Sequence, residues 1–437
     1  MKKRSKIMIG LLMLVCLSVV LMGCNAAKKG GNAASTSKNE EEITLNIWHI
    51  WTDSESGDRR AIDEYIELYT KEHPNVKIEQ DAADTESYKT KLKVAFSGSD
   101  LPDVFFTYGA GFSKLFVDTG KVLALDDILG EETKNKLVGG AEANFIYNNQ
   151  LYGLPIKMWT GTFYCNKELF EKENIELPMD WDQLMTAVES FRAKGYQPMT
   201  LGAKDAWHIA MYFDQIAIRE AGVDGVMKAM KGEKKFNDPE FLKAAEDLVA
   251  LVNAKAFNDG FGGLGAQEAQ AEFLMGRIPM YFNGSWMTGD MQSDVNSVKD
   301  KIVALPFPSM PGQKGDQTQY SGGAIDGWAV SSVSKNKEVA VDFMAGLAEF
   351  QSNASYKSGD GIAVWKTEMN ESELNPLLVQ INSNVKDATA FALAWDTQLS
   401  GADVDIYLSN LQSLVGGGLT PQEFVDALQN QLSVSMK

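Results

Sequence analysis

The stretch ITLNIWHIW (residues 43–51) opens the folded part of the chain and decides its fold class. Its aliphatic residues occupy every second position from 43 to 47, which is the period of a β-strand. In the segment 62–69 the apolar residues recur at helical spacing, and Pro74 ends that helix. The next expected elements are a strand at 76–78, a helix at 88–96 and a strand at 103–107. The order β-α-β-α-β predicts an α/β fold built on an open, mainly parallel sheet.

A sheet of this kind binds ligands in the crevice at the carboxyl ends of its strands. Asp53 lies in the first loop between strand and helix, and Tyr108 follows the third strand. We therefore expect both side chains to contact a ligand. Trp48, at the end of the first strand, fits a ligand site and a hydrophobic core equally well.

A second series of strands and helices follows Pro155. The segment 162–165 has the pattern of a strand, and residues 178–183 mark the start of a helix with Asp180 as its N-cap and Gln183 three positions later. Further helices are expected at 209–220, 241–252 and 338–349, and further strands at 278–282 and 325–331. The part after residue 353 is mostly helical in pattern, and Thr420-Pro421 open its last helix.

The N-terminal segment has the pattern of an export signal. A basic start is followed by the apolar run 7–22, which is short for a membrane span, and then by Gly23-Cys24. The segment 1–23 resembles a lipoprotein signal peptide, which implies that Cys24 carries the lipid. Residues 24–42 contain mainly Ala, Gly, Ser, Asn, Lys and Glu, so we expect a flexible linker.

Composition narrows the function classes. The 437 residues carry a formal net charge of −18, which argues against nucleic-acid binding because proteins of that class are basic. The length favours two domains. Cys165 is the one cysteine of the folded part and is expected to be a small core residue. The three histidines have no metal-ligand spacing, so we expect neither a metal nor another cofactor.

Six segments in order carry a family resemblance. They are GSDLPDV (98–104), LYGLP (151–155), YCNKELF (164–170), PMDWDQL (178–184), FLMGRIPMYFNGSW (273–286) and residues 320–341. Together with the first strand and its loop, their order and spacing resemble the extracellular solute-binding proteins of the sugar-binding ABC-importer family, which includes maltose-binding protein. The resemblance covers nearly the whole chain after the linker.

The resemblance implies a periplasmic-binding-protein-like clamp of two lobes that closes on a carbohydrate. Each lobe is expected to be a mainly parallel sheet flanked by helices, with a helical C-terminal part. The implied boundaries are 43–156 and 312–348 for lobe I, and 157–311 and 349–437 for lobe II. The implied partners are a mono- or oligosaccharide and the permease subunits of an ABC importer. We expect a monomer outside the cytoplasmic membrane, held there only by its lipid.

Aromatic residues indicate where a sugar binds, because indole rings stack on the apolar faces of sugar rings and carboxylates accept hydrogen bonds from the hydroxyl groups. The chain has nine tryptophans. Trp286, after a short Asn-Gly-Ser turn, is the strongest candidate, followed by Trp207 and Trp159. Other candidates are Trp365, Trp395, Asp396 and Asp326, with helix packing as the alternative role of the two tryptophans. Trp181 and Trp328 are expected in the core.

No sequence motif for catalysis stands out. The chain lacks G-x-S-x-G, H-E-x-x-H and the phosphate-binding loop motif. Residues 260–265 match G-x-G-x-x-G, but no expected strand precedes them, so we interpret them as a surface loop. We therefore expect a receptor and no enzyme. Two alternatives stay open, which are a receptor for another polar solute and a surface enzyme that degrades glycosides with two carboxylates.

Overall fold

The computed structural model describes residues 42–98 and 100–433. The predicted signal peptide and the lipidation site Cys24 lie outside these residues. Within the described ranges, no helix is both long and apolar enough to cross a lipid bilayer.

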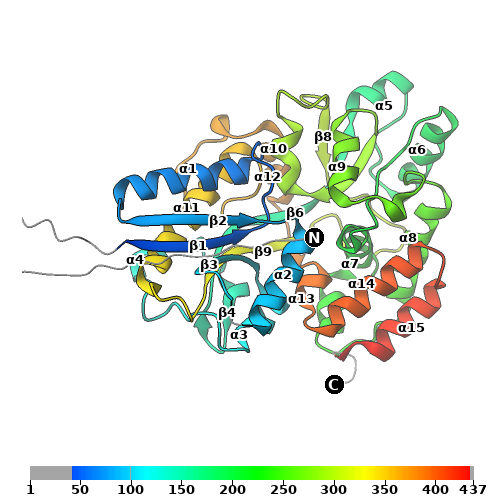
Figure 1. The fold of residues 1–437 in the computed structure, drawn as a ribbon. Helices are drawn as coiled ribbons and strands as arrows, with labels where there is room; N and C mark the ends of the chain where they lie inside the picture. The colour runs from blue at the N-terminus through cyan, green and yellow to red at the C-terminus, as the bar shows by residue number, and fades with distance from the viewer. Residues whose placement is uncertain (1–41, 99, 434–437) are drawn as a thin grey trace, which may run out of the picture. The chain divides into compact units, whose positions relative to one another are not determined.

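One mixed sheet of eight strands organises the described chain (Figure 1). Its main path runs β2-β1-β3-β9-β6-β7, with β10 beside β9 and β8 beside β6, and β4 and β5 form a separate pair. The strands are β1 Ile43–His49, β2 Val76–Ala82, β3 Val104–Tyr108, β4 Ile146–Tyr147, β5 Gln150–Leu151, β6 Leu154–Asn166, β7 Met280–Gly284, β8 Ile302–Leu305, β9 Gln319–Val330 and β10 Ala390–Ala392.

The sheet confirms the α/β class but is mixed and not mainly parallel. The strand β1 pairs in parallel with β2 and β3, as the sequence predicts. The pairs β3–β9, β6–β9, β6–β7 and β6–β8 are antiparallel. The chain runs along β6 from the N-terminal to the C-terminal core and returns along β9, so these neighbouring strands are antiparallel.

The helices follow the predicted order and extend beyond the predicted ranges. They are α1 Gly57–Glu72, α2 Thr85–Ser97, α3 Ala110–Val117, α4 Glu131–Asn135, α5 Lys167–Glu173, α6 Trp181–Ala193, α7 Ala206–Met230, α8 Pro239–Asn253, α9 Ala266–Leu274, α10 Thr288–Met291, α11 Lys337–Ser358, α12 Pro376–Val385, α13 Trp395–Gln398, α14 Ala402–Val415 and α15 Pro421–Gln431. Short 3₁₀-helices are η1 Ala143–Phe145, η2 Phe261–Gly263, η3 Ser285–Met287 and η4 Glu371–Glu373.

Local sequence signals account for several helix starts. The Asp180 side chain accepts a hydrogen bond from the backbone N–H of Gln183, so Asp180 is the N-cap of α6 as predicted. The Gln183 side chain in turn accepts from Met179 N–H, one residue before the cap. At α15, Thr420 and Glu423 form a capping box. Each cap satisfies backbone donors that the first helical turn leaves free.

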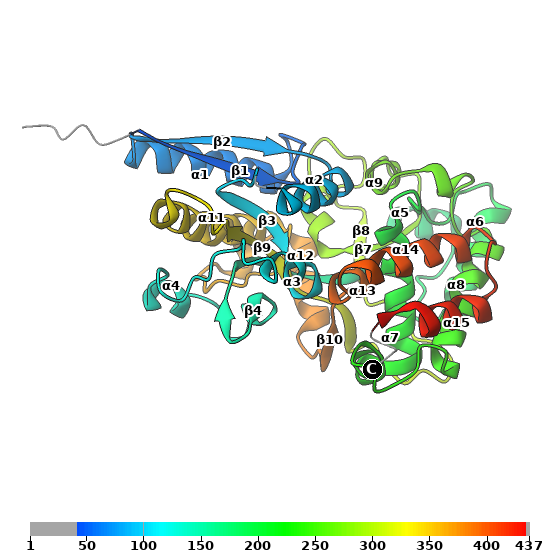
Figure 2. The same cartoon turned by 60° about the horizontal axis from the view of Figure 1, so that its bottom comes forward.

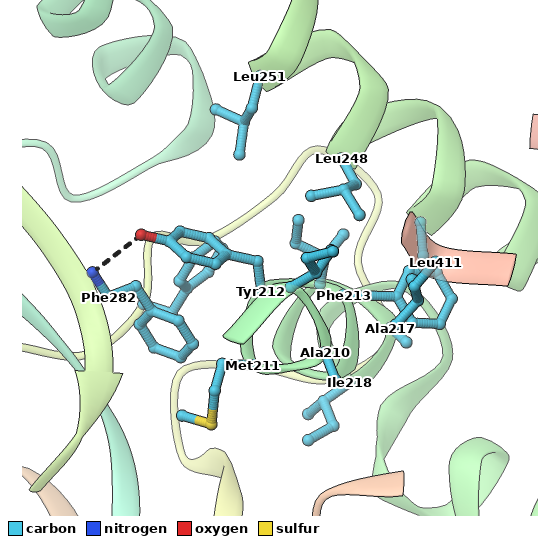
Figure 3. Packing of buried hydrophobic residues seen from close by; sticks show 14 of the residues in the cluster. Ala210, Met211, Tyr212, Phe213, Ala217, Ile218, Leu248, Leu251, Phe282 and Leu411 are labelled. Atoms are coloured by element: carbon cyan, nitrogen blue, oxygen red, sulfur yellow. Dashed lines mark hydrogen bonds between the residues drawn. The ribbon is translucent and has the colours of Figure 1, made fainter. Parts of the chain in front are cut away.

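Two large hydrophobic cores lie along the sheet. The N-terminal core takes its buried residues from 45–156 and 328–365, and the C-terminal core takes them from 159–325 and 392–432. Figure 3 shows part of the C-terminal core, where Tyr212 and Phe213 of α7 lie among residues of α8 and β7 and where Phe282 N–H donates to the Tyr212 hydroxyl. A smaller third core contains Phe273, Met287 and Met291. The lobe boundaries themselves stay a prediction.

Helices cover both faces of the strands around these cores. In the N-terminal part, α1 packs on α11 on one face of β1, β2 and β3, and α2 and α3 lie on the other face (Figure 1). Figure 2 shows α14 and α15 beside α7 and α8 in the C-terminal part. Trp181, Trp328 and Cys165 are buried in the cores, as the sequence predicts.

The strands β6 and β9 each contribute residues to the N-terminal and the C-terminal core. They pair with each other where the chain passes from one core to the next. Their register pairs Lys157 with Asp326 and Trp159 with Gly323, with irregularities on both sides of Lys157. Gly322 adopts φ +146°, a conformation that L-residues rarely adopt, and a Cβ there would overlap the carbonyl oxygen of Trp159. A third segment, residues 358–362, lies beside β6 through two hydrogen bonds between Met158 and Ile362.

Gly322→Ala tests how tightly these strands are packed. We expect it to lower the free energy of unfolding by more than about 1 kcal/mol, because the added methyl group meets backbone and the residue must keep a positive φ. Gly139→Ala is the matched control, since no heavy atom lies within 4 Å of its added Cβ. Calorimetric melting of both variants decides the matter, and equal melting temperatures would refute the tight approach.

Candidate functional site

Three of the predicted tryptophans lie together beside the end of β7. The ring centroids of Trp159 and Trp286 are 5.0 Å apart with an interplanar angle of 76°, and those of Trp207 and Trp286 are 6.2 Å apart. Trp159 is buried, whereas Trp207 and Trp286 are half-buried. The structure thus brings three predicted site residues from β6, α7 and η3 into one aromatic group.

Strand pairing explains how Trp159 and Trp286 meet. Gly161 of β6 pairs with Gly284 of β7, and Thr160 N–H donates to Ser285 Oγ at 3.2 Å. Trp159 precedes Thr160 and Trp286 follows Ser285, so this hydrogen bond brings the two tryptophans side by side. A Cβ on Gly284 would overlap the six-membered ring of Trp286, so the ring lies directly over this glycine. The indole is therefore held on one side by backbone.

A polar group lies at the carboxyl end of β3. Tyr108 pairs with Asp326 of β9 in the sheet register, and Lys89 Nζ of α2 lies 5.5 Å from the Tyr108 ring centroid. Lys89 Nζ is also 3.9 Å from Asp396 Oδ2 of α13. Burial raises the pKa of Asp396, and the nearby Lys89 opposes that shift. Tyr108, Asp326 and Asp396, all predicted site residues, thus form a second group.

The aromatic group and the polar group are connected through the antiparallel strands β6 and β9. Asp326 lies opposite Lys157 on β6, and Trp159 of the aromatic group follows Lys157 by two residues. Burial raises the pKa of Asp326 to about 6, and Lys157 opposes the shift. Lys157 itself is 2% exposed and forms a buried ion pair with Asp58 at the start of α1. The other Asp58 oxygen accepts from Gln351 Nε2 and Ser355 Oγ of α11.

Asp53 and Trp48 lie outside these two groups. Asp53 is exposed in the loop before α1, where its Oδ1 accepts from Glu55 N–H at 2.9 Å. Trp48 packs in the N-terminal part, with Lys91 Nζ of α2 at 3.7 Å from its ring centroid. Among the described residues, no hydrogen bond, ion pair or ring contact joins either residue to the aromatic or the polar group.

Trp365 and Trp395 are core residues in this structure. Trp395 has no exposed surface, stacks on Tyr407 at 5.4 Å and meets Phe213 and Phe241 edge-on. Trp365 is 1% exposed, and its Nε1 donates to the carbonyl oxygen of Pro155 at 2.7 Å. Neither ring has a face left for a ligand, so we omit both from the proposed site. Their positions in a helical C-terminal part carried no signal that separates core from site.

Sequence reasoning missed the charged residues around Lys157. A lysine inside the apolar run Leu154–Trp159 is a signal that was available, because a buried lysine needs an acidic partner. Asp326 was a predicted site residue, but its contact with Lys157 was not foreseen. The other partners, Asp58 and Asp360, lie far from Lys157 in the chain, and no local pattern marks them. Trp51 was also omitted from the predicted contacts, although it lies at 6.0 Å from Lys157 Nζ and packs edge-on against Phe106.

Two surface hollows are present elsewhere. One, of about 740 Å³, is lined by α6 residues and Ala254, and the other, of about 170 Å³, lies near β4 and β5. Neither is lined by a predicted site residue, and both lack aromatic side chains. The glycine-rich stretch 260–265 forms the short helix η2 and its flanks, as expected for a surface loop.

Comparison with known proteins connects this geometry to a family. The sequence profile of the bacterial extracellular solute-binding proteins matches residues 53–349. A curated relative, an uncharacterized ABC transporter extracellular-binding protein of Pyrococcus horikoshii, is 29% identical over 275 residues, which are 62% of this chain and 62% of that protein.

Solved structures extend the comparison. A structure from work on xylan utilization by the thermophilic bacterium Caldanaerobius polysaccharolyticus is 37% identical with a TM-score of 0.86, and the match covers 89% of this chain and 100% of that one. A chitin oligosaccharide binding protein is 27% identical with a TM-score of 0.80, over 89% of this chain and 97% of that one.

Truncating two tryptophans separates the core from the aromatic group. Trp395→Ala should lower the free energy of unfolding by roughly 3–5 kcal/mol, because it leaves a large cavity among packed rings. Trp286→Ala should cost clearly less, because its ring is half-buried. Melting curves of the ligand-free variants measure both effects, and a larger loss for Trp286→Ala would show that its ring serves the core.

Proposed function

Because this chain belongs to the family of bacterial extracellular solute-binding proteins, we propose that it captures an oligosaccharide outside the cell and delivers it to an ABC importer. The observation that carries the proposal is the aromatic group of Trp159, Trp207 and Trp286 beside a polar group. Names of relatives support the class of ligand, since one of the similar structures is a chitin oligosaccharide binding protein and another comes from work on xylan.

The two groups have complementary roles in this proposal. Trp286 stacks on the apolar face of a sugar ring, and the half-buried Trp207 lies beside it. The buried Trp159 meets the Trp286 ring edge-on and supports it from the protein side. Tyr108, Asp326 and Asp396 bind hydroxyl groups, with Lys89 holding Asp396 in place. We keep Asp53 as a contact from the loop before α1 and Trp48 as a peripheral one.

The capture mechanism is closure of two lobes built around the N-terminal and C-terminal cores. The connecting segments β6, β9 and 358–362 would bend while the cores stay rigid, which is the general behaviour of hinge closure. A sugar that contacts both cores binds the closed arrangement better and shifts the population toward it. The closed monomer would then dock on the permease subunits of the importer.

We propose a receptor and not an enzyme, and a sugar panel tests both statements. Xylotetraose and chitotetraose, with maltotetraose and raffinose for comparison, should include one sugar that raises the melting temperature without any product appearing in the solution. The same sugar should lower the radius of gyration measured by small-angle scattering. Hydrolysis products would favour an enzyme, and no stabilisation by any sugar would count against carbohydrate capture.

Trp286→Ala should weaken binding of the sugar found in that panel. A buried aromatic contact is worth on the order of 2 kcal/mol when it is truncated, which corresponds to about a thirtyfold loss of affinity. Isothermal titration measures the loss. Trp181→Ala is the control, because Trp181 packs in the C-terminal core at the start of α6 and should lower stability but not affinity. Unchanged affinity of Trp286→Ala would remove it from the site.

We also propose that Cys24 anchors the protein to the outer face of the cytoplasmic membrane through a lipid. The support is the sequence alone, with an apolar run that ends at Gly23 and a polar linker behind it. Cys24→Ala should give a protein that is released into the medium or keeps its signal segment. Intact-mass analysis of the wild type should show an acylated cysteine at the N-terminus, and an unmodified start at another residue would disprove the anchor.

A further inference from the structure

Asp360 is a buried carboxylate in the segment that connects α11 with the rest of the chain. It is 5% exposed and follows Gly359, which ends α11 with φ +98°. Its backbone N–H donates to the Ser355 carbonyl oxygen at 2.7 Å, and Ser358 Oγ donates to its Oδ2 at 2.5 Å. These bonds fix the direction of the side chain.

Two glycines from different parts of the molecule enclose this carboxylate. A Cβ added to Gly57, the first residue of α1, would overlap Asp360 Oδ2, and a Cβ added to Gly289 of α10 would overlap Oδ1. The helix α1 packs on the N-terminal core, whereas Met287 and Met291 around α10 belong to the smaller third core. The Asp360 carboxylate therefore lies between α1 and α10, in contact with Gly57 on one side and Gly289 on the other. A side chain at either glycine would overlap the carboxylate.

The charges that face Asp360 are mostly negative. Asp58 of α1, Asp290 of α10 and Lys157 of β6 act on it directly, and Asp326 of β9 faces the same lysine. Lys157 is bound to Asp58, so one cation serves four carboxylates. Arg60 of α1 and Asp53 of the loop before α1 also act on Asp290. Asn375, the N-cap of α12, is neutral and donates hydrogen bonds to the carbonyl oxygens of Ser358 and Thr288.

We propose that Asp360 is a positioning residue that takes up a proton when α10 closes against α1, so that sugar capture is tighter in acidic surroundings. The inference rests on the proposed function, because it assumes that the two sides separate when the protein opens. In the open arrangement Asp360 would be solvated and ionised, and in the closed one an ionised Asp360 would face like charges without water.

The direction of the pH effect follows from the surroundings of the closed form. Burial, followed by the nearby Asp58, raises the pKa of Asp360 to about 7, with Lys157 opposing. At pH values between the ordinary pKa of an aspartate and about 7, the closed form holds a proton on Asp360 that the open form lacks. Closure is therefore favoured as the pH falls through 7, and the contribution disappears above it. The affinity gain between pH 9 and pH 6 is roughly tenfold.

Proton uptake on binding is the direct test. Xylotetraose and chitotetraose are titrated at pH 6 in phosphate and in imidazole, two buffers with different ionisation enthalpies. We expect the wild type to take up close to one proton per sugar bound and Asp360→Asn to take up almost none, because the amide has the shape of the neutral acid but does not titrate. Asp127→Asn, at an exposed position, should behave as the wild type. Equal uptake by the wild type and Asp360→Asn overturns the proposal.

Small-angle scattering of the ligand-free protein keeps the two hypotheses separable. If neither sugar binds, the choice of ligand fails, but pH still acts on closure through Asp360. The radius of gyration of the wild type should fall as the pH is lowered from 8.5 to 5.5, because the closed form holds a proton that the open form lacks. Asp360→Asn should give the same radius at both pH values, whereas Asp127→Asn should behave as the wild type. Equal pH dependence of the radius in the wild type and in Asp360→Asn overturns the role of Asp360.

Discussion

The buried positive charge of Lys157 is the constraint on which the centre of this protein depends. An ammonium group 2% exposed is stable only beside a carboxylate, and Asp58 at the start of α1 supplies it. Asp58 is in turn satisfied by Gln351 and Ser355 of α11. This chain of contacts ties β6 to the two helices that cover one face of the N-terminal sheet. Removing either partner of the ion pair would leave a buried charge without compensation.

The same lysine brings the connecting segments together. Lys157 pairs with Asp326 of β9 in the sheet. The segment 358–362 lies so close to Lys157 that a Cβ on Gly361 would overlap the lysine side chain. The aromatic group begins two residues beyond Lys157, and the polar group is built on Asp326. The pairing of β6 with β9 around Lys157 therefore positions both groups of the candidate site. A change in this pairing would move the two groups together.

Sequence reasoning recovered what short-range physics determines. The alternation in β1 and the cap at Asp180 are local patterns, and each has the predicted structure. The turn expected before Trp286 was wrong, because Asn283 and Gly284 still belong to β7 and Ser285 begins the short helix η3. The antiparallel pairing of β6 and β9 was missed, because their paired residues are more than 160 positions apart and either direction fits an apolar run. Trp395 was placed in the site for the same reason, since its burial depends on Phe213 and Tyr407 from other helices. In the cluster around Lys157, the carboxylates of Asp58 and Asp360 have no local signal in the sequence.

The late position of β9 in the chain has a consequence for how the protein folds. β9 pairs with β3, β6 and β10, yet it begins at Gln319, after most of the chain has been made. The N-terminal core cannot be completed before that strand arrives, so contacts between distant residues control the folding rate, and such topologies fold slowly. A growing chain of this kind cannot complete its native fold until β9 has been made. For a protein of an extracellular family, that delay leaves time for transport across the membrane in the unfolded state.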